Sequence, residues 1–214
     1  MMRRTINKSE KTWRLLPRFS LLFVFVLLAV SSFEIPVQAQ DGTIMGKARA
    51  RGARHSGDAV VYIEKIPGKT FSPPNKPVIL DQLKLTFVPH VLPVLVGTTV
   101  AFPNSDEVRH NVFSISRTKR FNLGTYPRGV TKYVTFDKPG VAALLCNVHT
   151  EMSAYVVVVE TPYFAVTQRD GSYVIRNVPP GRYILKVWHE RLKPQNKEIE
   201  VVAGLPTQAN FDLL

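Results

Sequence analysis

The stretch Cys146-Asn147-Val148-His149-Thr150-Glu151-Met152 separates two apolar runs, at residues 141–145 and 154–159. Both runs have the composition of β-strands. A loop that joins two strands can direct its thiol, its imidazole and its thioether towards one point. This donor set suits copper better than zinc, which does not use methionine as a ligand. The loop therefore predicts a copper site that needs one more ligand from elsewhere in the chain.

The first 39 residues have the features of a secretory signal peptide. Six Lys and Arg residues precede a wholly apolar run at residues 21–30, and Val37-Gln38-Ala39 supplies small residues for cleavage. The apolar run is shorter than the ~20 residues of a membrane helix. We therefore expect an exported, periplasmic protein that is cleaved near Ala39 and has no stable membrane span in its mature chain. An uncleaved membrane anchor is the alternative.

The chain is basic and has a single cysteine. Its formal net charge is +12; residues 1–39 hold six basic and two acidic side chains, which leaves +8 for the remainder. In an exported protein this charge favours an acidic partner or an anionic membrane surface over nucleic acid. A solvated basic surface without a partner is the alternative. Cys146 cannot form an intramolecular disulfide, and a lone thiol in an oxidising compartment is expected to be buried or bound to a metal.

The sequence after residue 40 predicts an all-β chain. No long amphipathic helical pattern appears there, and short β-branched and aromatic runs alternate with Gly, Pro and Asn. Four prolines between residues 67 and 77 exclude a regular element, so we assign residues 67–78 to a connector. Strands are predicted at residues 42–48, 59–63, 83–89, 91–96, 98–102, 110–114, 132–136, 141–145, 154–159, 173–175, 183–188, 197–202 and 209–213.

Residues 83–159 resemble a cupredoxin, the family of small type 1 copper proteins that includes plastocyanin and amicyanin. The resemblance rests on Gly97-Thr-Thr-Val-Ala-Phe-Pro-Asn104, on His110-Asn111 and on Cys146-x-x-His149-x-x-Met152, whose short loop is similar to that of amicyanin. It implies that one copper ion is held by four ligands: His110, Cys146, His149 and Met152. Two imidazoles, a thiolate and a long axial methionine make a blue-copper site, which serves one-electron transfer. The alternative is that Cys146 is a core residue and the histidines are incidental.

Other polar residues have weaker signals. The resemblance implies that Asn111 joins the two ligand loops by a hydrogen bond, with Asn147 as its partner; ordinary turn formation is the alternative. His90, in Phe-Val-Pro-His, and His189, in Trp-His-Glu, are predicted at strand ends, with metal ligation as the alternative. Glu151 is expected to face solvent, because blue copper avoids hard oxygen donors.

The two ends of the chain resemble the carboxypeptidase regulatory-like domain, a small Ig- or transthyretin-like β sandwich. The resemblance rests on residues 170–185, Asp-Gly-Ser-Tyr-Val-Ile-Arg-Asn-Val-Pro-Pro-Gly-Arg-Tyr-Ile-Leu, and on Gly42-Thr-Ile-Met-Gly46 and Ala59-Val-Val-Tyr-Ile63. We therefore expect residues 40–66 and 161–214 to form one discontinuous sandwich. A cupredoxin Greek-key sandwich at residues 79–160 would be inserted into it. The alternative is that residues 42–63 pair with the cupredoxin strands.

Both pieces together are similar to bacterial proteins described as plastocyanin-like or methylamine-utilisation proteins. The predicted function is that of an exported type 1 copper protein that carries single electrons and is not an enzyme. Its basic surface favours an acidic redox partner, such as a c-type cytochrome or a redox enzyme. A copper carrier without redox turnover and a β-sandwich scaffold with a structural metal are the alternatives. The sequence contains no Gly-x-Ser-x-Gly, Walker or His-Glu-x-x-His pattern.

Overall fold

A computed structural model describes residues 40–214, which lie in one compact unit. The predicted signal peptide at residues 1–39 falls outside the described residues. Residues 40–214 contain strands and turns and no helix, which confirms the all-β prediction. Accordingly, this part of the chain has no helix that is long and apolar enough to cross a membrane.

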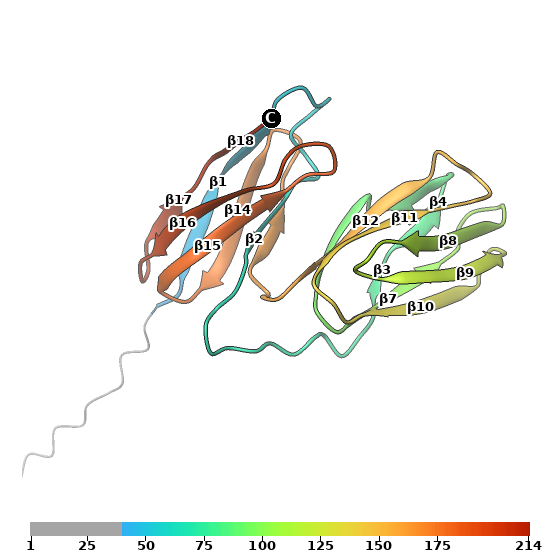
Figure 1. Cartoon of the computed structure of the whole chain (residues 1–214), viewed down its shortest axis with the longest axis horizontal. Coiled ribbons are helices and arrows are strands. Elements are labelled where there is room, and N and C mark those ends of the chain that lie inside the picture. Colours follow the sequence, from blue (N-terminus) through green and yellow to red (C-terminus); the bar gives the residue numbers. More distant parts are fainter. Residues whose placement is uncertain (1–39) are drawn as a thin grey trace, which may run out of the picture. The chain divides into compact units, whose positions relative to one another are not determined.

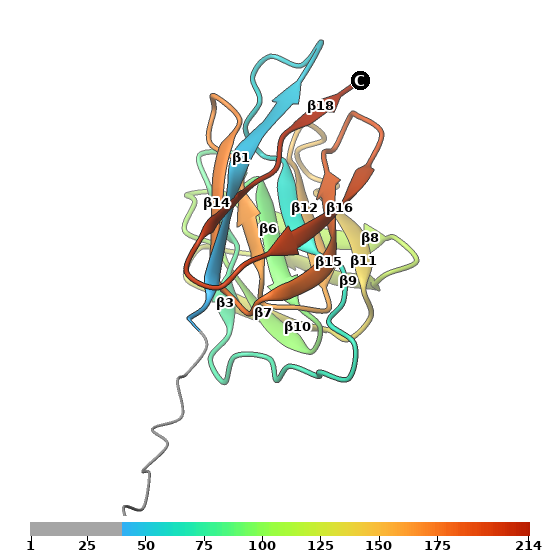
Figure 2. The same ribbon diagram turned by 90° about the vertical axis from the view of Figure 1, so that its left-hand side faces the viewer.

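The first two strands of the described chain pair with its last strands. One sheet is built around β1 (Gly42–Ala50), which runs antiparallel to β14 (Ser172–Val178) and parallel to β17 (Pro206–Gln208) and β18 (Phe211–Leu213). Figure 2 shows β1 beside β14 and β18. The other sheet has the order β13 (Phe164–Val166), β2 (Val60–Ile63), β15 (Gly181–Trp188) and β16 (Gln195–Val201). The strands of both sheets contribute to one apolar core, whose members include Ile44, Val61, Ile175, Leu185 and Leu213.

The middle of the chain forms a second sandwich, drawn mostly in green and yellow in Figure 1. Its larger sheet has the order β6 (Val91–Leu95), β12 (Ser153–Val159), β11 (Gly140–Leu145), β8 (His110–Ile115) and β9 (Arg120–Tyr126). Its smaller sheet has the order β10 (Thr131–Phe136), β7 (Thr98–Pro103) and β3 (Val78–Ile79). The core of this sandwich includes Phe102, Phe136, Leu144, Val156 and Val158.

The strand predicted at residues 83–89 is a hairpin instead. β4 (Asp81–Leu83) pairs with β5 (Thr86–Val88) across a turn in which Lys84 and Leu85 have φ angles of 53° and 59°. Two consecutive left-handed residues are typical of a tight hairpin turn, which normally contains Gly, Asn or Asp. Lys and Leu rarely adopt this conformation. The sequence therefore shows no turn signal here, and the alternation of apolar residues suggested one continuous strand. The prediction also missed four strands: β3, β9, β13 and β17.

A third apolar cluster joins the two sandwiches. Val157 and Val159 of β12 and Val91 of β6 lie in this cluster with Val60 of β2. Tyr155 of β12 packs on Trp188 of β15, with ring centroids 5.3 Å apart. We call this contact the seam. Because side chains alternate along a strand, β12 buries Val156 and Val158 in the second sandwich and its other two valines in the seam.

These pairings support the proposal that residues 40–66 and 161–214 form one domain interrupted by the other sandwich. Residues 67–77 contain no strand, in keeping with a connector, and β3 begins at Val78. The close approach of β1 to the C-terminal segment offers a test. A Cβ added at Gly46 would lie 1.8 Å from the carbonyl oxygen of Ala209, whose N–H donates to the oxygen of Met45.

Gly46→Ala is expected to lower the free energy of unfolding by about 1–3 kcal/mol, because the backbone must shift to admit the methyl group. Thermal or denaturant unfolding followed by circular dichroism measures this change. Met45→Ala, at the neighbouring position that is exposed, is the matched control and should cost about 0.5 kcal/mol or less. Equal stability of the wild type and Gly46→Ala would contradict the packing of β1 against residues 209–213.

Candidate metal centre

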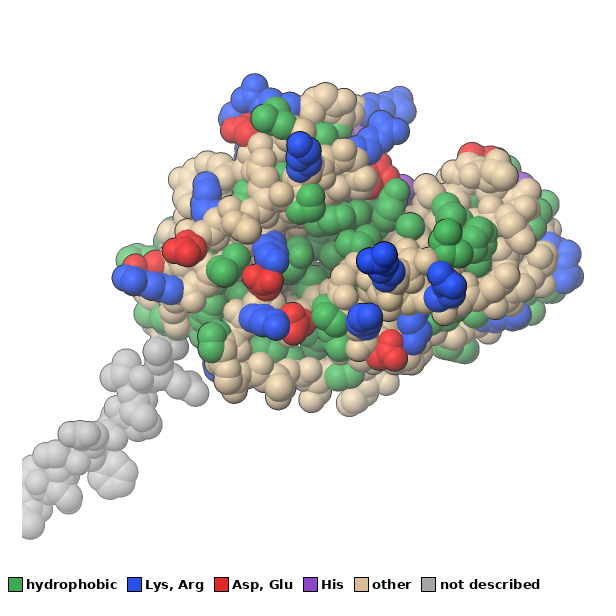
Figure 3. All heavy atoms as spheres, viewed as in Figure 1, with side chains coloured by type: hydrophobic (Ala, Val, Ile, Leu, Met, Phe, Trp, Pro, Cys, Tyr) green, Lys and Arg blue, Asp and Glu red, His purple; other side chains and the backbone are tan. Residues whose placement is uncertain are grey.

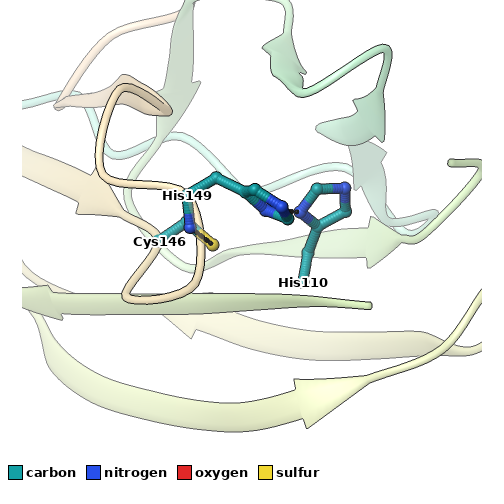
Figure 4. A group of neighbouring side chains, drawn as sticks. All are labelled: His110, Cys146 and His149. Atoms are coloured by element: carbon teal, nitrogen blue, oxygen red, sulfur yellow. Dashed lines mark hydrogen bonds between the residues drawn. The ribbon is translucent and has the colours of Figure 1, made fainter. Parts of the chain in front are cut away.

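Three donor side chains meet at one end of the second sandwich. His110 is the first residue of β8, Cys146 directly follows β11, and His149 lies in the loop that leads to β12. Pairing of Leu145 with Ser153 in the β11–β12 ladder closes this loop, and pairing of Leu145 with Phe113 brings it beside β8. Figure 4 shows the His110 and His149 rings facing each other, with the Cys146 sulfur nearby.

The donor atoms are close enough to share one ion. One ligand atom from each of His110, Cys146 and His149 lies within 4.8 Å of the others. The Nδ1 atoms of the two histidines are 3.0 Å apart, and the backbone N–H of His149 donates to the Cys146 Sγ at 3.5 Å. His110 is fully buried, Cys146 is 3% exposed, and His149 is half-buried. Metal–nitrogen and metal–sulfur bonds of about 2.0–2.3 Å are compatible with this spacing.

Asp106 orients the buried histidine. Its Oδ2 lies 3.0 Å from His110 Nε2 and accepts the backbone N–H of Leu85 at 2.7 Å, while Oδ1 accepts the N–H of Glu107 at 3.0 Å. The Leu85 N–H, followed by the His110 side chain, holds the pKa of Asp106 below its usual range. The ionised carboxylate therefore accepts the Nε2–H of His110, which leaves the Nδ1 lone pair directed to the centre. Such carboxylate–histidine pairs are common behind metal ligands.

Met152, the predicted axial ligand, closes the loop from inside. It is 1% exposed and belongs to the same apolar cluster as Cys146. Its backbone N–H donates to the carbonyl oxygen of His149 at 3.1 Å, which makes the end of the loop a tight turn. The structure thus places Met152 in the same apolar core as Cys146. Its role as a ligand stays a prediction.

The asparagines differ from the expectation. The side-chain nitrogen of Asn111 donates to Asn122 Oδ1 at 2.8 Å, on the neighbouring strand β9, and not to Asn147. Asn147 is exposed on the loop. The predicted hydrogen bond between Asn111 and Asn147 is therefore wrong, because the β8–β9 pairing places a closer acceptor beside Asn111. Asn111 Oδ1 is buried and has no hydrogen-bond partner among the described residues.

Sequence reasoning missed Asp106 and treated Glu151 correctly as exposed. The signal for Asp106 was its place four residues before His110. His90 and His189 lie away from this centre, beside the seam. The donors that do meet are soft or borderline, and two of the three are buried, which fits a thiophilic transition metal.

The comparisons with known proteins divide the chain in two. Residues 152–214 match the family model of the carboxypeptidase regulatory-like domain. This match begins at the end of the ligand loop and so includes β12, which pairs within the second sandwich. The chain matches no curated protein.

Several solved structures resemble the middle of the chain. A copper-containing nitrite reductase from Thermus scotoductus SA-01 is 28% identical over 46% of this chain and 25% of that chain, with a TM-score of 0.39. A purple cupredoxin from Nitrosopumilus maritimus is 27% identical over 38% of this chain and 98% of its own, with a TM-score of 0.35. A reduced mutant of amicyanin is 23% identical over 47% and 98%, with a TM-score of 0.37.

The structural relatives of the chain thus include cupredoxins, and its C-terminal part matches a carboxypeptidase regulatory-like domain. The chain spans about a quarter of the length of the nitrite reductase that it resembles.

Asp106→Asn is expected to weaken metal binding about 10–100-fold, because the neutral amide holds His110 Nε2 less firmly than a carboxylate does. Titration with Co²⁺, followed by the thiolate-to-metal absorption, measures the affinity. Glu107→Gln is the matched control, because the side chain of Glu107 is exposed and pairs with Arg128; the Co²⁺ affinity of this variant should equal that of the wild type. Unchanged Co²⁺ affinity in Asp106→Asn would show that the carboxylate does not support the site.

Proposed function

We propose that this chain is an exported type 1 copper protein that carries single electrons between redox partners. The observation that carries the proposal is the meeting of one thiol and two imidazoles within 4.8 Å, with the thiol and one imidazole buried in the core. Bound copper supplies a one-electron couple at such a site. His110, Cys146, His149 and Met152 would hold one ion, with Asp106 behind His110.

The chain supports this role by fixing its donors in place. His110 and Cys146 stand at the ends of paired strands, and Met152 directly precedes β12. A ligand set held by a β sandwich rearranges little when the charge of the ion changes, which keeps electron transfer fast. The left-handed turn at Lys84 and Leu85 adds a further constraint, since the Leu85 N–H fixes the carboxylate that orients His110.

Burial favours an electron carrier over a carrier of copper. His110 is fully buried, and Cys146 and Met152 are 3% and 1% exposed. Release of an ion from these side chains would require the loop to open away from the core. Electrons need no such opening, because His149 is half-buried and its ring lies nearer the surface of the loop. We therefore place electron exchange at His149.

Exposed apolar side chains on the ligand loop and on the segments that support it are suited to contact with a partner. Val148 is 46% exposed next to the histidine, and Leu85 and Val108 are exposed on segments that contact or contain the Asp106 loop. The wider surface is basic: Lys and Arg side chains are scattered over the face shown in Figure 3. Long-range attraction would steer an acidic protein, such as a c-type cytochrome, and the apolar contact would then admit close approach.

The proposal places the protein outside the cytoplasm, on the strength of the leader sequence at residues 1–39. The single cysteine agrees with this location, because Cys146 is buried and would be bound to metal. The proposal does not include an enzymatic role. The resemblance to a nitrite reductase covers only 25% of that protein, and its activity is not transferred to this chain.

Addition of Cu²⁺ to the purified chain is expected to produce an intense blue absorption band, because thiolate-to-copper charge transfer gives type 1 sites their colour. Visible absorption spectroscopy measures the band. Cys146→Ala should abolish it while leaving the circular dichroism of the β-sheets intact. A chain that stays colourless, or a band that survives in Cys146→Ala, would end the proposal.

Val148→Asp is expected to slow electron self-exchange about tenfold, the factor given by about 1.4 kcal/mol of lost contact energy. The reason is that two molecules would meet at this apolar surface and bury a carboxylate there. NMR line broadening in mixtures of oxidised and reduced protein measures the rate. Ile115→Asp is the control with the same charge change, at the exposed far end of β8. Equal slowing in both variants would argue against His149 as the exchange site.

A further inference from the structure

The three histidines that the metal centre leaves unused line a single cavity. The chain has five histidines, and His110 and His149 belong to the centre. His55, His90 and His189 all line a cavity of about 240 Å³ beside the seam, which we call the seam cavity. Two carboxylates, Asp58 and Glu190, and two arginines, Arg54 and Arg191, line it as well. Residues distant in the sequence thus place imidazoles and carboxylates together.

The contacts of His90 require one positive charge more than a neutral ring supplies. His90 Nδ1 lies 3.1 Å from the carbonyl oxygen of Ser153, and His90 Nε2 lies 3.1 Å from Glu190 Oε2. Both oxygens can only accept, and a neutral imidazole carries a single N–H. If Nδ1–H donates to Ser153, the lone pair of Nε2 faces a carboxylate. That contact is stable only with a proton or a metal ion between the two atoms.

The arrangement of His90 is the one that metal-binding histidines adopt. Their second ring nitrogen donates to a backbone carbonyl or a carboxylate, which fixes the tautomer and aims the other nitrogen at the ion. The two carboxylate oxygens of Glu190 have different partners. Its Oε2 contacts His90, whereas its Oε1 is 3.9 Å from Arg191 Nε. One carboxylate oxygen is therefore directed to the imidazole and the other to a cation.

His189, which precedes Glu190 in the sequence, is a further imidazole in the lining of the seam cavity. It is 6% exposed. The backbone N–H of Arg191 donates to His189 Nδ1 at 3.2 Å. To act as a ligand, Nδ1 would exchange this local hydrogen bond for a metal bond.

We propose that the seam cavity binds a second divalent transition-metal ion, with His90 Nε2 and Glu190 Oε2 as its first two ligands and His189 as the third. Imidazole and carboxylate donors without sulfur suit Zn²⁺ or Cu²⁺. His55 and Asp58 line the same cavity and are the candidates for a fourth ligand. The site goes beyond the proposed electron carrier, because it shares no ligand with the centre around Cys146.

An ion in the seam cavity would join the two sandwiches. His90 directly precedes β6 of one sandwich, and Glu190 follows β15 of the other. His90 also holds the ligand loop, since its Nδ1 contacts the carbonyl of Ser153 and its own carbonyl accepts the N–H of Tyr155. Ser153 adjoins Met152. The second ion would therefore fasten the strand that carries the end of the ligand loop.

The test is to load the untagged full chain with Cu²⁺, remove excess metal by gel filtration, and count copper per chain by elemental analysis and by electron paramagnetic resonance. We expect two ions, one with a blue band and one with an ordinary tetragonal signal. Cys146→Ser should lose the first and keep the second. His90→Gln and Glu190→Gln should each keep the blue band, which shows that they fold, and bind the second ion at least tenfold more weakly.

Glu198→Gln, which alters an exposed carboxylate on β16, is the control and should keep both ions. A wild-type chain that binds only one ion would overturn the proposal, because a proton would then lie between His90 Nε2 and Glu190 Oε2. A second signal that persists in both His90→Gln and Glu190→Gln would overturn it as well, because the ion is then adventitious. Loss of the blue band with retention of the second ion would refute the electron carrier and leave the seam site standing.

Discussion

Burial of both faces of β12 is the constraint on which the rest of the structure depends. Val156 and Val158 pack in the core that contains Cys146, whereas Val157 and Val159 pack in the seam with Val60. This strand has little freedom to slide, because a one-residue shift would exchange its two faces and put Tyr155, which packs at the seam, in place of Ala154 in the core. The register that pairs Leu145 with Ser153 is thereby fixed, and with it the length and closure of the ligand loop. The position of Met152 therefore depends on the packing of β12 at the seam as much as on its packing in the core that contains Cys146.

Within that frame, a single carboxylate sets the electrostatics of the centre. Asp106 accepts two backbone N–H groups in addition to His110 Nε2, so its charge is stabilised before any metal arrives. The cost of this arrangement falls on the backbone, since Lys84 and Leu85 both adopt left-handed conformations to present the Leu85 N–H. Strain of this kind is characteristic of functional sites, where a fixed geometry is needed. The hairpin that sequence patterns concealed is therefore the element that orients a ligand.

The metal-binding side chains could be predicted from the sequence, whereas the residues that hold them in place by hydrogen bonds could not. Cys146, His149 and Met152 are informative because their spacing within one loop is local, and the resemblance to cupredoxins then pointed to His110. Asp106 and the partner of Asn111 depend on which loops and strands become neighbours, and no local pattern encodes that. The alternation of apolar residues correctly indicated an all-β chain, but it failed at Lys84, where side-chain composition opposes the backbone conformation. Largely exposed strands such as β9 and β17 were missed because they bury too few apolar side chains to leave a clear period of two.

At the seam, as at the metal centre, electron-pair donors meet in a place that is partly shielded from water, but the donors differ. Valines and aromatic rings exclude water from most of this contact, yet His90 and Glu190 meet at its edge. Bringing an imidazole and a carboxylate together in a partly dry place is costly unless a positive charge lies between them. At the metal centre, two Nδ1 atoms lie 3.0 Å apart beside a thiol. Because this donor set is soft or borderline, it favours copper. At the seam the donors are nitrogen and oxygen, so the charge that satisfies them is a proton or a harder divalent ion. Since His90 reaches the backbone beside Met152, the occupant of the seam bears directly on the rigidity of the ligand loop.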